Sequence, residues 1–366
     1  MHDRELLKQI LEATRDLWDR SETRPAVREN FARMLDCRTP VLGAEVYASE
    51  DEEKLVPHTC KSRACPSCGY RATLLWQREQ SVALPDIPYA SIVLTMPDVL
   101  WPIFRENRHL LHDLPGLGAD VIQQWVKARY GVRVLIMVVQ HTFGGDLKFY
   151  PHLHILVSAG GLQESEGRWL ARLRFDKSAL MPMWRYAVIT YLRAALKANV
   201  LASSLEAKEL WHTSTTQYER WWHIYIDRLM SKRHFLGYAA RYVRRPPIAQ
   251  RRLLKVTDRE VEFLTKEGRT KQLVKIRYSL EEFIAALAVH VLDRYRHAVR
   301  YFGLLAPGAK SRTSAGLFAI LRQQKRPRPK RLSWRNSLLR YFGVDPLIDS
   351  RGQVMHWVGR QMPAAQ

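Results

Sequence analysis

Apolar residues follow a helical spacing at the start of the chain and form strand-like runs in its middle. Residues 4–35 place large apolar side chains at helical intervals, and Pro25 breaks the pattern because proline cannot continue a helix through its own position. Residues 37–68 show no strong periodicity. Residues 89–96 are apolar and β-branched and lie between two prolines, so they predict a buried strand.

The centre of the chain predicts two further strands next to a helix. The expected elements are a helix over 98–130 interrupted near Pro115 and Gly116, buried strands over 132–141 and 152–158, and glycine turns at 144–145 and 160–161. Because a short loop joins the two strands, we expect them to form an antiparallel pair.

The second half alternates between helices and short strands and ends in a basic tail. The expected elements are helices over 180–232 and 234–245, strand-like segments over 251–257, 260–265 and 272–278, and an amphipathic helix over 280–302. Pro246 and Pro247 end the second of these helices. The apolar side of the last helix carries Phe283, Ile284, Leu287, Val291 and Tyr295. Residues 323–332 are basic and contain prolines, so they predict a linker without regular structure.

The composition indicates a folded and strongly basic protein. A chain of 366 residues with 46% apolar residues can bury a sizeable core, and its length predicts two or three structural units. Lys and Arg number 58 against 36 Asp and Glu, which gives a net charge of +22. Such a surface favours a nucleic acid partner, because Lys and Arg that neutralise phosphates release condensed counterions. An anionic membrane would attract the same charge.

The apolar runs argue against a membrane protein. None approaches the roughly 20 residues that span a bilayer, and the longest, 92–96 and 132–139, have the length of strands. The first residues, Met-His-Asp-Arg-Glu-Leu-Leu-Lys, carry acids and lack the apolar segment of a signal peptide. We therefore expect a cytoplasmic protein with no membrane partner.

Two histidines separated by one residue form the first candidate site. Residues two apart in a strand face the same side, so the imidazoles of His152 and His154 point toward a common position. An antiparallel hairpin would return His141 beside them. Three neutral imidazoles leave coordination positions open, which suits a catalytic metal ion. The alternative is a chance pair of histidines, with His141 capping the end of a strand.

Two tyrosines one helical turn apart form the second candidate site. Tyr238 and Tyr242 project their phenols from the same helix face, with small residues between them that leave room for a DNA strand. A phenol has a pKa of about 10 and is a weak nucleophile, so it needs a nearby cation during phosphoryl transfer. The alternative is an aromatic pair packed in the core. The candidate DNA-binding arginines are Arg241, Arg244, Arg245, Arg251 and Arg252.

All four cysteines lie in the aperiodic stretch, and they form the third candidate site. They are Cys37, Cys60, Cys65 and Cys68. Four thiolates suit a tetrahedral structural zinc ion. Disulfides do not persist in a cytoplasmic chain, and a redox Cys-x-x-Cys pair needs no further cysteines. Zinc is therefore favoured, with His58 as a substitute ligand if Cys37 lies too far away.

These motifs, in this order, resemble the transposases of the insertion sequence 91 family, which are HUH endonucleases. HUH denotes two histidines around a hydrophobic residue, here His152, Leu153 and His154. The resemblance covers most of the chain. It includes the cysteine block at 60–69, the strand at 88–97, residues 141–147 before Pro-His-Leu-His, the Gly-Tyr-Ala-Ala-Arg-Tyr segment from 237, and the segments at 280–284 and 301–307.

The resemblance implies an α+β fold with a central antiparallel sheet flanked by helices. It also implies three domains. These are an N-terminal helical and zinc-binding module at 1–84, a HUH endonuclease domain at 85–304 with a helical insertion at about 180–232, and a helical, basic C-terminal extension at 305–366.

The resemblance further implies a reaction. Tyr238 or Tyr242 attacks the phosphate at one transposon end and forms a 5′ phosphotyrosine and a free 3′ hydroxyl, and the other tyrosine serves the second strand transfer of rolling-circle transposition. His141, His152 and His154 would hold Mg²⁺ or Mn²⁺, although imidazoles intrinsically favour softer metals. The phosphotyrosine conserves the bond energy, so no nucleotide cofactor is needed, and the chain lacks a Gly-x-x-x-x-Gly-Lys loop.

The expected DNA partner and the rival functions follow from the same motifs. The zinc module and the basic tail would recognise single-stranded or hairpin transposon ends in the cytoplasm, at the bacterial nucleoid. A HUH replication initiator or relaxase would share the chemistry and differ in the DNA it serves. A non-catalytic zinc-containing DNA-binding regulator would explain the charge and the cysteines, but it would leave the histidines and tyrosines without a role.

Overall fold

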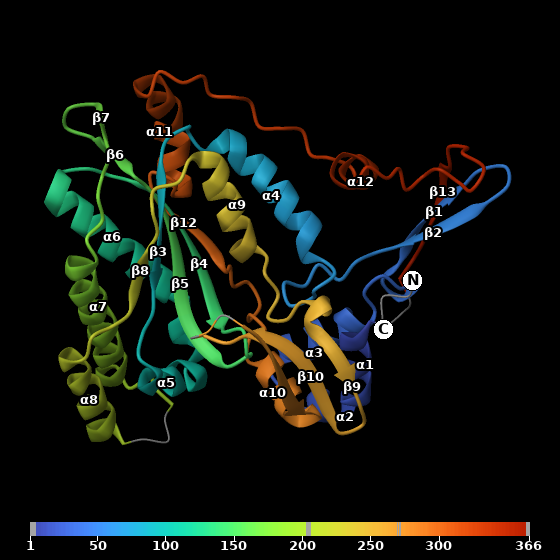
Figure 1. Cartoon of the computed structure of the whole chain (residues 1–366), viewed down its shortest axis with the longest axis horizontal. Helices are drawn as coiled ribbons and strands as arrows, with labels where there is room; N and C mark the ends of the chain where they lie inside the picture. The colour runs from blue at the N-terminus through green and yellow to red at the C-terminus, as the bar shows by residue number, and fades with distance from the viewer. Residues whose placement is uncertain (1–4, 203–205, 269, 271, 364–366) are drawn as a thin grey trace.

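A five-stranded antiparallel sheet lies at the centre of the computed structural model, which describes residues 5–202, 206–268, 270 and 272–363 (Figure 1). The strands in spatial order are β12 (Val299–Gly303), β4 (Leu135–Phe143), β5 (Phe149–Ser158), β3 (Tyr89–Leu94) and β8 (Ile224–Ile226). The expected antiparallel pairing of β4 with β5 is confirmed. Helices flank this sheet on both faces, so the predicted α+β class is confirmed.

Alternate residues of the central strands enter two separate cores, one on each face of the sheet. Leu153 and Ile155 of β5 belong to the first core, whereas Leu156 belongs to the second. This alternation follows from the pleat, in which successive side chains point to opposite faces. Because both faces are covered, β4 and β5 are apolar along most of their length.

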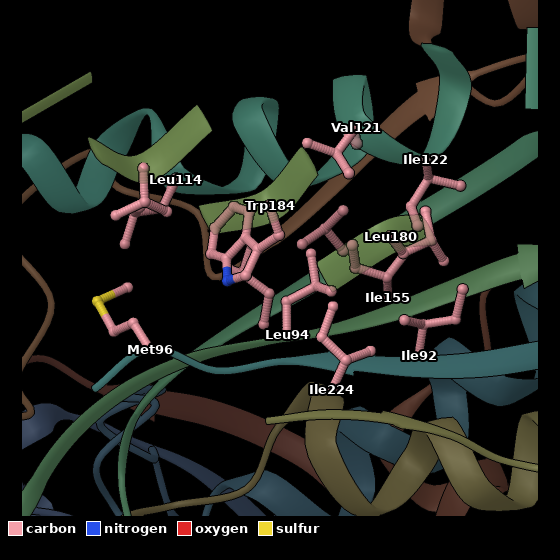
Figure 2. Packing of buried hydrophobic residues seen from close by; sticks show 14 of the residues in the cluster. Ile92, Leu94, Met96, Leu114, Val121, Ile122, Ile155, Leu180, Trp184 and Ile224 are labelled. Atoms are coloured by element: carbon pink, nitrogen blue, oxygen red, sulfur yellow. The ribbon is translucent and has the colours of Figure 1, made fainter. Parts of the chain in front are cut away.

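The first core lies between the sheet and a layer of helices. These are α5 (Trp101–Glu106), α6 (Leu114–Tyr130), α7 (Lys177–Lys197) and α8 (Ala207–Thr216). Figure 2 shows Trp184 of α7 beside Leu94 and Ile224 of the sheet. Its indole nitrogen donates a 2.7 Å hydrogen bond to the carbonyl of Thr95, so its one polar atom is satisfied. Truncating a buried aromatic of this size costs about 3–5 kcal/mol of stability.

The second core lies under three other helices. These are α4 (Gly69–Ala83), α9 (Lys232–Val243) and α11 (Pro307–Ile320). Helix α9 begins at the Ser231 side chain, which accepts a hydrogen bond from the His234 amide, and it ends before Pro246. Phe235 stacks on Tyr89 of the sheet with ring centroids 4.2 Å apart. The predicted helix over 234–245 is therefore confirmed, and its packing fixes which face it turns to the sheet.

A third core joins the N-terminal helices to segments from late in the sequence. The elements are α1 (Leu6–Ala13), α2 (Arg15–Trp18), α3 (Pro25–Leu35), β9 (Leu253–Val256), β10 (Glu260–Lys266), β11 (Leu273–Ser279) and α10 (Leu280–Ala288). Trp18 and Phe31 pack in the same cluster as Phe263 and Phe283. Helix α3 starts at Pro25 and the three strands form one sheet, so both predictions are confirmed.

The remaining elements form a three-stranded sheet and a small hairpin. They are β1 (Ala44–Ala48), β2 (Glu53–Pro57) and β13 (His356–Gln361), the pair β6 (Gly160–Gln163) and β7 (Arg168–Ala171), and helix α12 (Trp334–Phe342). Residues 323–332 have no regular structure, as expected. In the part of the chain that the structure describes, no helix is both long and apolar enough to cross a bilayer. The domain boundaries at 84 and 304 stay a prediction.

Two of the expected helices extend too far. Residues 180–232 contain α7 and α8 but end in strand β8, and residues 203–205 lie outside the described part. Helix α10 ends at Ala288, Tyr295 is 87% exposed with a left-handed backbone, and residues 299–303 form β12. In both places a short segment pairs with an edge of the central sheet, and this tertiary pairing overrides local helical spacing.

Two expected interruptions are also misplaced. Gly160 and Gly161 lie in strand β6, where close packing requires glycine: a Cβ atom on Gly160 would lie 2.5 Å from the Trp169 indole nitrogen. The helix expected over 98–130 breaks at residues 107–112 and resumes as α6 at Leu114. Pro115 therefore occupies its first turn, where the amide hydrogen that proline lacks would have no partner within the helix. Finally, the aperiodic stretch 37–68 contains the β1–β2 hairpin.

Candidate active site and metal centres

Strands β4 and β5 bring the three histidines together on the sheet face that α9 covers. His141 lies directly opposite His152 in the antiparallel register, and His154 lies opposite Val139. One ring nitrogen from each histidine lies within 4.8 Å of the others. His152 and His154 approach most closely, with 3.2 Å between their Nε2 atoms. The hairpin geometry expected from the sequence therefore brings the three imidazoles to one position.

Burial keeps these imidazoles neutral. Loss of hydration lowers the pKa of His152 to about 4 and that of His154 to about 2, and it holds the pKa of His141 well below 6.5. The positive charge of Arg245 further lowers the pKa of His152 and His154. A neutral imidazole carries the lone pair that a metal ion needs, so all three histidines can act as metal ligands.

Hydrogen bonds from neighbouring backbone orient two of the rings. His152 Nδ1 donates to the carbonyl of Tyr150 at 2.7 Å, which leaves the Nε2 lone pair free. His141 Nε2 bonds the carbonyl of Tyr242 at 2.8 Å, which leaves its Nδ1 atom as the acceptor. Two ligands of one ion at about 2.0–2.1 Å lie about 3 Å apart, close to the spacing of the His152 and His154 nitrogens. The histidines present therefore fit a divalent metal ion.

Helix α9 places both tyrosines beside this cluster. The ring centroid of Tyr242 lies 3.9 Å from that of His154 and 5.8 Å from that of His141. Tyr238 lies one turn earlier, 4.9 Å from Tyr242. Burial raises the pKa of the Tyr238 phenol above its usual range, and the neighbouring Tyr242 hydroxyl adds to this shift. Tyr238 is therefore a weaker nucleophile in the free protein than an exposed phenol.

The five candidate arginines have different surroundings. The Arg241 guanidinium lies 4.8 Å over the Tyr238 ring, and that of Arg245 lies 5.9 Å from the Phe143 ring. Arg244 and Arg251 are exposed. Arg252 instead donates to the backbone carbonyls of Leu264 and Gly145, so its guanidinium supports the loop between β4 and β5. Arg241 thus lies against Tyr238, and Arg245 lies against the Phe143 ring.

The four cysteines come together from three separate segments. Cys37 follows α3, Cys60 follows β2, and Cys65 and Cys68 precede α4. Their sulfur atoms lie 3.5–3.8 Å apart in the contacts between them. Four thiolates around a tetrahedral zinc ion at about 2.3 Å would be about 3.8 Å apart, so the cluster fits structural zinc. All four sulfurs lie within 4.8 Å of one another.

His58 is not a member of this cluster. Its ring nitrogens lie 3.2 Å from the Leu42 carbonyl and from the Glu45 carboxylate. Cys37 reaches the other sulfurs, so the condition under which His58 would substitute for it does not arise.

Sequence reasoning missed three residues that line the candidate active site. Phe143 stacks on His141 with ring centroids 4.9 Å apart, and Tyr150 stacks on His152 at 4.5 Å. The period of two along β4 and β5 places each of them on the histidine face, so this signal was present in the sequence. Arg63, between Cys60 and Cys65, bonds the carbonyls of Tyr242 and Val243, and no sequence pattern indicates this contact.

A basic groove of about 1650 Å³ extends from the zinc module to the C-terminal segment. Its walls carry the basic side chains Arg33, Arg38, Lys54, Lys61, Arg63, Arg71, Arg78, Arg244, Arg328 and Arg331. The acidic residues of its lining, Glu45 and Glu79, are paired with Arg360 and Arg328. Tyr70, which is 62% exposed, and Phe342 add aromatic rings to the lining. Charge and aromatic surface therefore occur together here.

Comparison with known proteins agrees with this arrangement. A family model described as a transposase zinc-binding domain matches residues 8–96, and one described as a putative transposase matches residues 136–314. The transposase for insertion sequence element IS801 of Pseudomonas savastanoi pv. phaseolicola is 34% identical over 289 residues, which cover 76% of this chain and 70% of that protein. The putative transposase y4qJ of Sinorhizobium fredii is 25% identical over 287 residues, covering 74% and 72%. No solved structure matches the chain.

The matched ranges contain the two sites. The four cysteines lie within residues 8–96, and the histidines and tyrosines lie within residues 136–314. The cysteine cluster and the matched zinc-binding domain together support a structural zinc ion. The chain belongs to the insertion sequence 91 family of transposases.

Proposed function

We propose that this transposase nicks and rejoins single strands of DNA at transposon ends through a 5′ phosphotyrosine, in rolling-circle transposition. One observation carries the proposal: Tyr242 lies 3.9 Å from His154, centroid to centroid, at the edge of three convergent, neutral imidazoles. Core packing alone would explain the spacing of the two tyrosines. It would not explain why their helix covers a buried set of metal ligands.

The reaction balances without an external energy source. The phenol oxygen of Tyr238 or Tyr242 forms a bond to the phosphorus, and the bond from the phosphorus to the 3′ oxygen breaks. The phenol proton is transferred, in net terms, to that oxygen, which leaves as a 3′ hydroxyl. A 3′ hydroxyl of another strand reverses these steps and releases the tyrosine, so two tyrosines can serve two strand transfers.

The surroundings of the tyrosines supply the charge that this reaction needs. His141, His152 and His154 would hold Mg²⁺ or Mn²⁺, which neutralises charge on the target phosphate when it is bound. The Arg245 guanidinium lies 5.9 Å from the Phe143 ring, which stacks on His141, and we assign it to the same phosphate. Burial raises the pKa of Tyr238, so such positive charge would favour loss of its phenol proton during the attack.

The basic groove is the proposed path for the DNA next to the cleavage site. Arg244, the residue after the last turn of α9, lines the groove and connects it with the active-site helix. Phosphates would lie against the basic walls, and unpaired bases of a single strand or hairpin loop would stack on the exposed aromatic rings. Replacing Lys61 and Arg331 with glutamate should weaken binding of a single-stranded oligonucleotide and reduce its salt dependence.

The decisive test is covalent capture of DNA. The variant with Tyr238→Phe and Tyr242→Phe should form no adduct with labelled single-stranded DNA on a denaturing gel in Mn²⁺. Its DNA affinity should stay within about twofold, because the substitutions remove only hydroxyl groups. Tyr186→Phe on the exposed face of α7 is the matched control and should form adducts normally. Adducts that persist in the double variant would exclude both tyrosines as nucleophiles.

A further inference from the structure

The end of the tyrosine helix lies against the zinc module. Helix α4, which starts at Gly69 directly after Cys68, packs along α9 (Figure 1). A Cβ atom on Gly69 would lie 2.7 Å from the carbonyl oxygen of Arg244, so the two backbones meet without space for a side chain. Gln77 of α4 donates to the Leu236 carbonyl at 3.2 Å. The zinc module therefore contacts α9 along its length and at its C-terminal end.

Arg63 makes the most specific of these contacts. Its guanidinium donates to the carbonyls of Tyr242 and Val243, at 3.2 Å for Tyr242. The last carbonyls of a helix form the negative end of its dipole, and that of Tyr242 also accepts from the Arg244 and Arg245 amides, at 3.4 Å for Arg245. A guanidinium satisfies two such carbonyls at once through its fixed fork of donors. Arg63 thus caps α9 from another part of the chain.

The position of Arg63 is set by its neighbours in the zinc loop. Cys60 and Cys65 flank it on both sides and belong to the cysteine cluster. Between them, Ser62 donates to the Asn30 side chain of α3 at 2.6 Å, and its hydroxyl accepts from the Ala64 amide. The loop is therefore held at both ends by the cluster and in the middle by α3.

The carbonyl that Arg63 bonds is also bonded by the histidine cluster. His141 Nε2 lies 2.8 Å from the Tyr242 carbonyl, on the same backbone group. One peptide group therefore connects the zinc loop, the candidate metal ligands and the candidate nucleophile. A shift of this group would move the Tyr242 ring relative to His154, whereas Tyr238 lies one full turn away.

We propose that Arg63 is a positioning residue through which the zinc module fixes the last turn of α9, and with it the Tyr242 phenol, against the histidine cluster. This inference rests on the proposed function, because it assigns a geometric requirement to the same reaction. It predicts that the zinc module contributes to the rate of strand cleavage as well as to DNA binding. It also predicts that the two tyrosines depend on the module to different degrees.

The test compares the two tyrosines separately in the full chain. Arg63→Ala is combined with Tyr238→Phe, which leaves Tyr242 as nucleophile, and with Tyr242→Phe, which leaves Tyr238. Single-turnover adduct formation should fall at least about tenfold in the first background and less than about threefold in the second. Arg63 also lines the basic groove, so the affinity for single-stranded DNA should fall by the same factor in both backgrounds, and the rates are compared at saturating DNA. An equal loss in both backgrounds, or no loss in either, would overturn the proposal.

Three further variants protect the test against misfolding. Arg63→Lys keeps the charge but lacks the fork, so it should recover part of the Tyr242-dependent rate. Gly69→Ala keeps Arg63 and all cysteines, but its methyl group would collide with the Arg244 carbonyl. It should lower the Tyr242-dependent rate of adduct formation more than the Tyr238-dependent rate. Arg28→Ala removes an exposed arginine of α3 that pairs with Asp19 and is the control for lost charge. Zinc content near one ion per chain shows that each variant keeps its module.

Hydrogen exchange supplies a measurement that does not depend on cleavage. In Arg63→Ala the backbone amides of residues 239–245 should exchange at least about tenfold faster, while those of α6 keep their wild-type rates. Unchanged exchange rates at 239–245 would contradict the proposal that Arg63 fixes the last turn of α9. If the wild-type chain itself formed no adduct with DNA, the proposed function would fail, and the exchange result would still decide whether Arg63 holds the helix.

Discussion

The cysteine and histidine clusters are alike in geometry and different in what holds them. In each, the ligand atoms lie within 4.8 Å of one another. The histidines stand on two adjacent strands, whose hydrogen-bonded register places His141 opposite His152. The cysteines come from the end of a helix, the end of a strand and the start of another helix, and no common element joins these segments. The sheet can therefore preorganise its imidazoles without an ion, whereas the thiolates depend on one.

This difference is the one expected between a reactive metal site, as proposed for the histidines, and a structural one. Four thiolates close a tetrahedron around zinc, whereas three imidazoles leave positions open for a phosphate. A third environment completes the comparison: His290 is also buried, but its Nε2 bonds the Leu147 carbonyl and its Nδ1 contacts the Thr142 hydroxyl. In contrast, His154 Nδ1 is buried without a hydrogen-bond partner among the described residues, and its Nε2 faces His152 Nε2 at 3.2 Å. His290 is a satisfied core histidine, and His154 is not.

The largest effect should follow from breaking the histidine cluster. His154→Ala removes one of three ligands, so adduct formation should fall by at least about a hundredfold, and excess Mn²⁺ should not restore it. Zinc content should remain near one ion per chain, because the cysteines lie on other segments. The control is His290→Asn, which disturbs a buried histidine outside the cluster and should leave cleavage within about tenfold. Cleavage at the wild-type rate in His154→Ala would remove the histidines from the reaction.

Breaking the cysteine cluster should act first on stability. Cys60→Ser should lose the zinc ion, and since the binding free energy of structural zinc is also folding free energy, the apparent unfolding temperature should fall by at least about 5 °C. Elemental analysis and a thermal scan measure both. The His154→Ala protein should keep its zinc ion. If Cys60→Ser kept its zinc and its unfolding temperature, Cys60 would not be a ligand and the contrast between the clusters would be lost.

The pH dependence of stability should reveal the buried imidazoles in the metal-free protein. The pKa of His154 is about 2 in the fold and about 6.5 in the unfolded chain, so the unfolded chain binds more protons between these values. Stability is therefore full above about pH 6.5 and declines as the pH falls, by about 1.4 kcal/mol per unit for this residue.

Urea unfolding of His154→Gln measures this contribution directly. Between pH 6.5 and pH 5 the free energy of unfolding should fall less steeply in the variant than in the wild type, by about 1.4 kcal/mol per pH unit. His290, whose pKa is also lowered by burial to about 4, contributes to both proteins and cancels in the difference. Equal slopes in the two proteins would mean that His154 is protonated, or exposed, at neutral pH.

Sequence patterns located the parts of the fold that are defined by short-range periodicity. The strands around His141 and His154 and the helix around Tyr238 were predictable because pleat and helix periods fix which residues share a face. Strands β8 and β12 were not, because each pairs with a sheet edge that other segments create. Spacing alone could not show that α9 would lie over the histidines. The resemblance to a known family joined the two motifs, and the structure supplied the contact between them.

The zinc module shows the same limit of sequence analysis: its ligands could be recognised, but its contact with α9 could not. Its ligands were recognisable because cysteine is scarce in this chain, with four in 366 residues. The bonds from Arg63 to the Tyr242 and Val243 carbonyls span about 180 positions and involve backbone acceptors, which every residue possesses. No residue type at the receiving end could have marked this contact in the sequence.

The smallest expected effect concerns the ring that supports His141. Phe143 stacks on the His141 imidazole with 4.9 Å between ring centroids and an 18° angle between planes. Phe143→Leu keeps an apolar side chain but removes the flat surface, so the imidazole can tilt about its hydrogen bond to the Tyr242 carbonyl. Adduct formation should fall about three- to tenfold, and the Mn²⁺ concentration for half-maximal rate should rise by a similar factor. Zinc content should not change, since Phe143 belongs to the histidine site alone. A fall in adduct formation of more than a hundredfold would show that the sheet does not preorganise the imidazoles by itself.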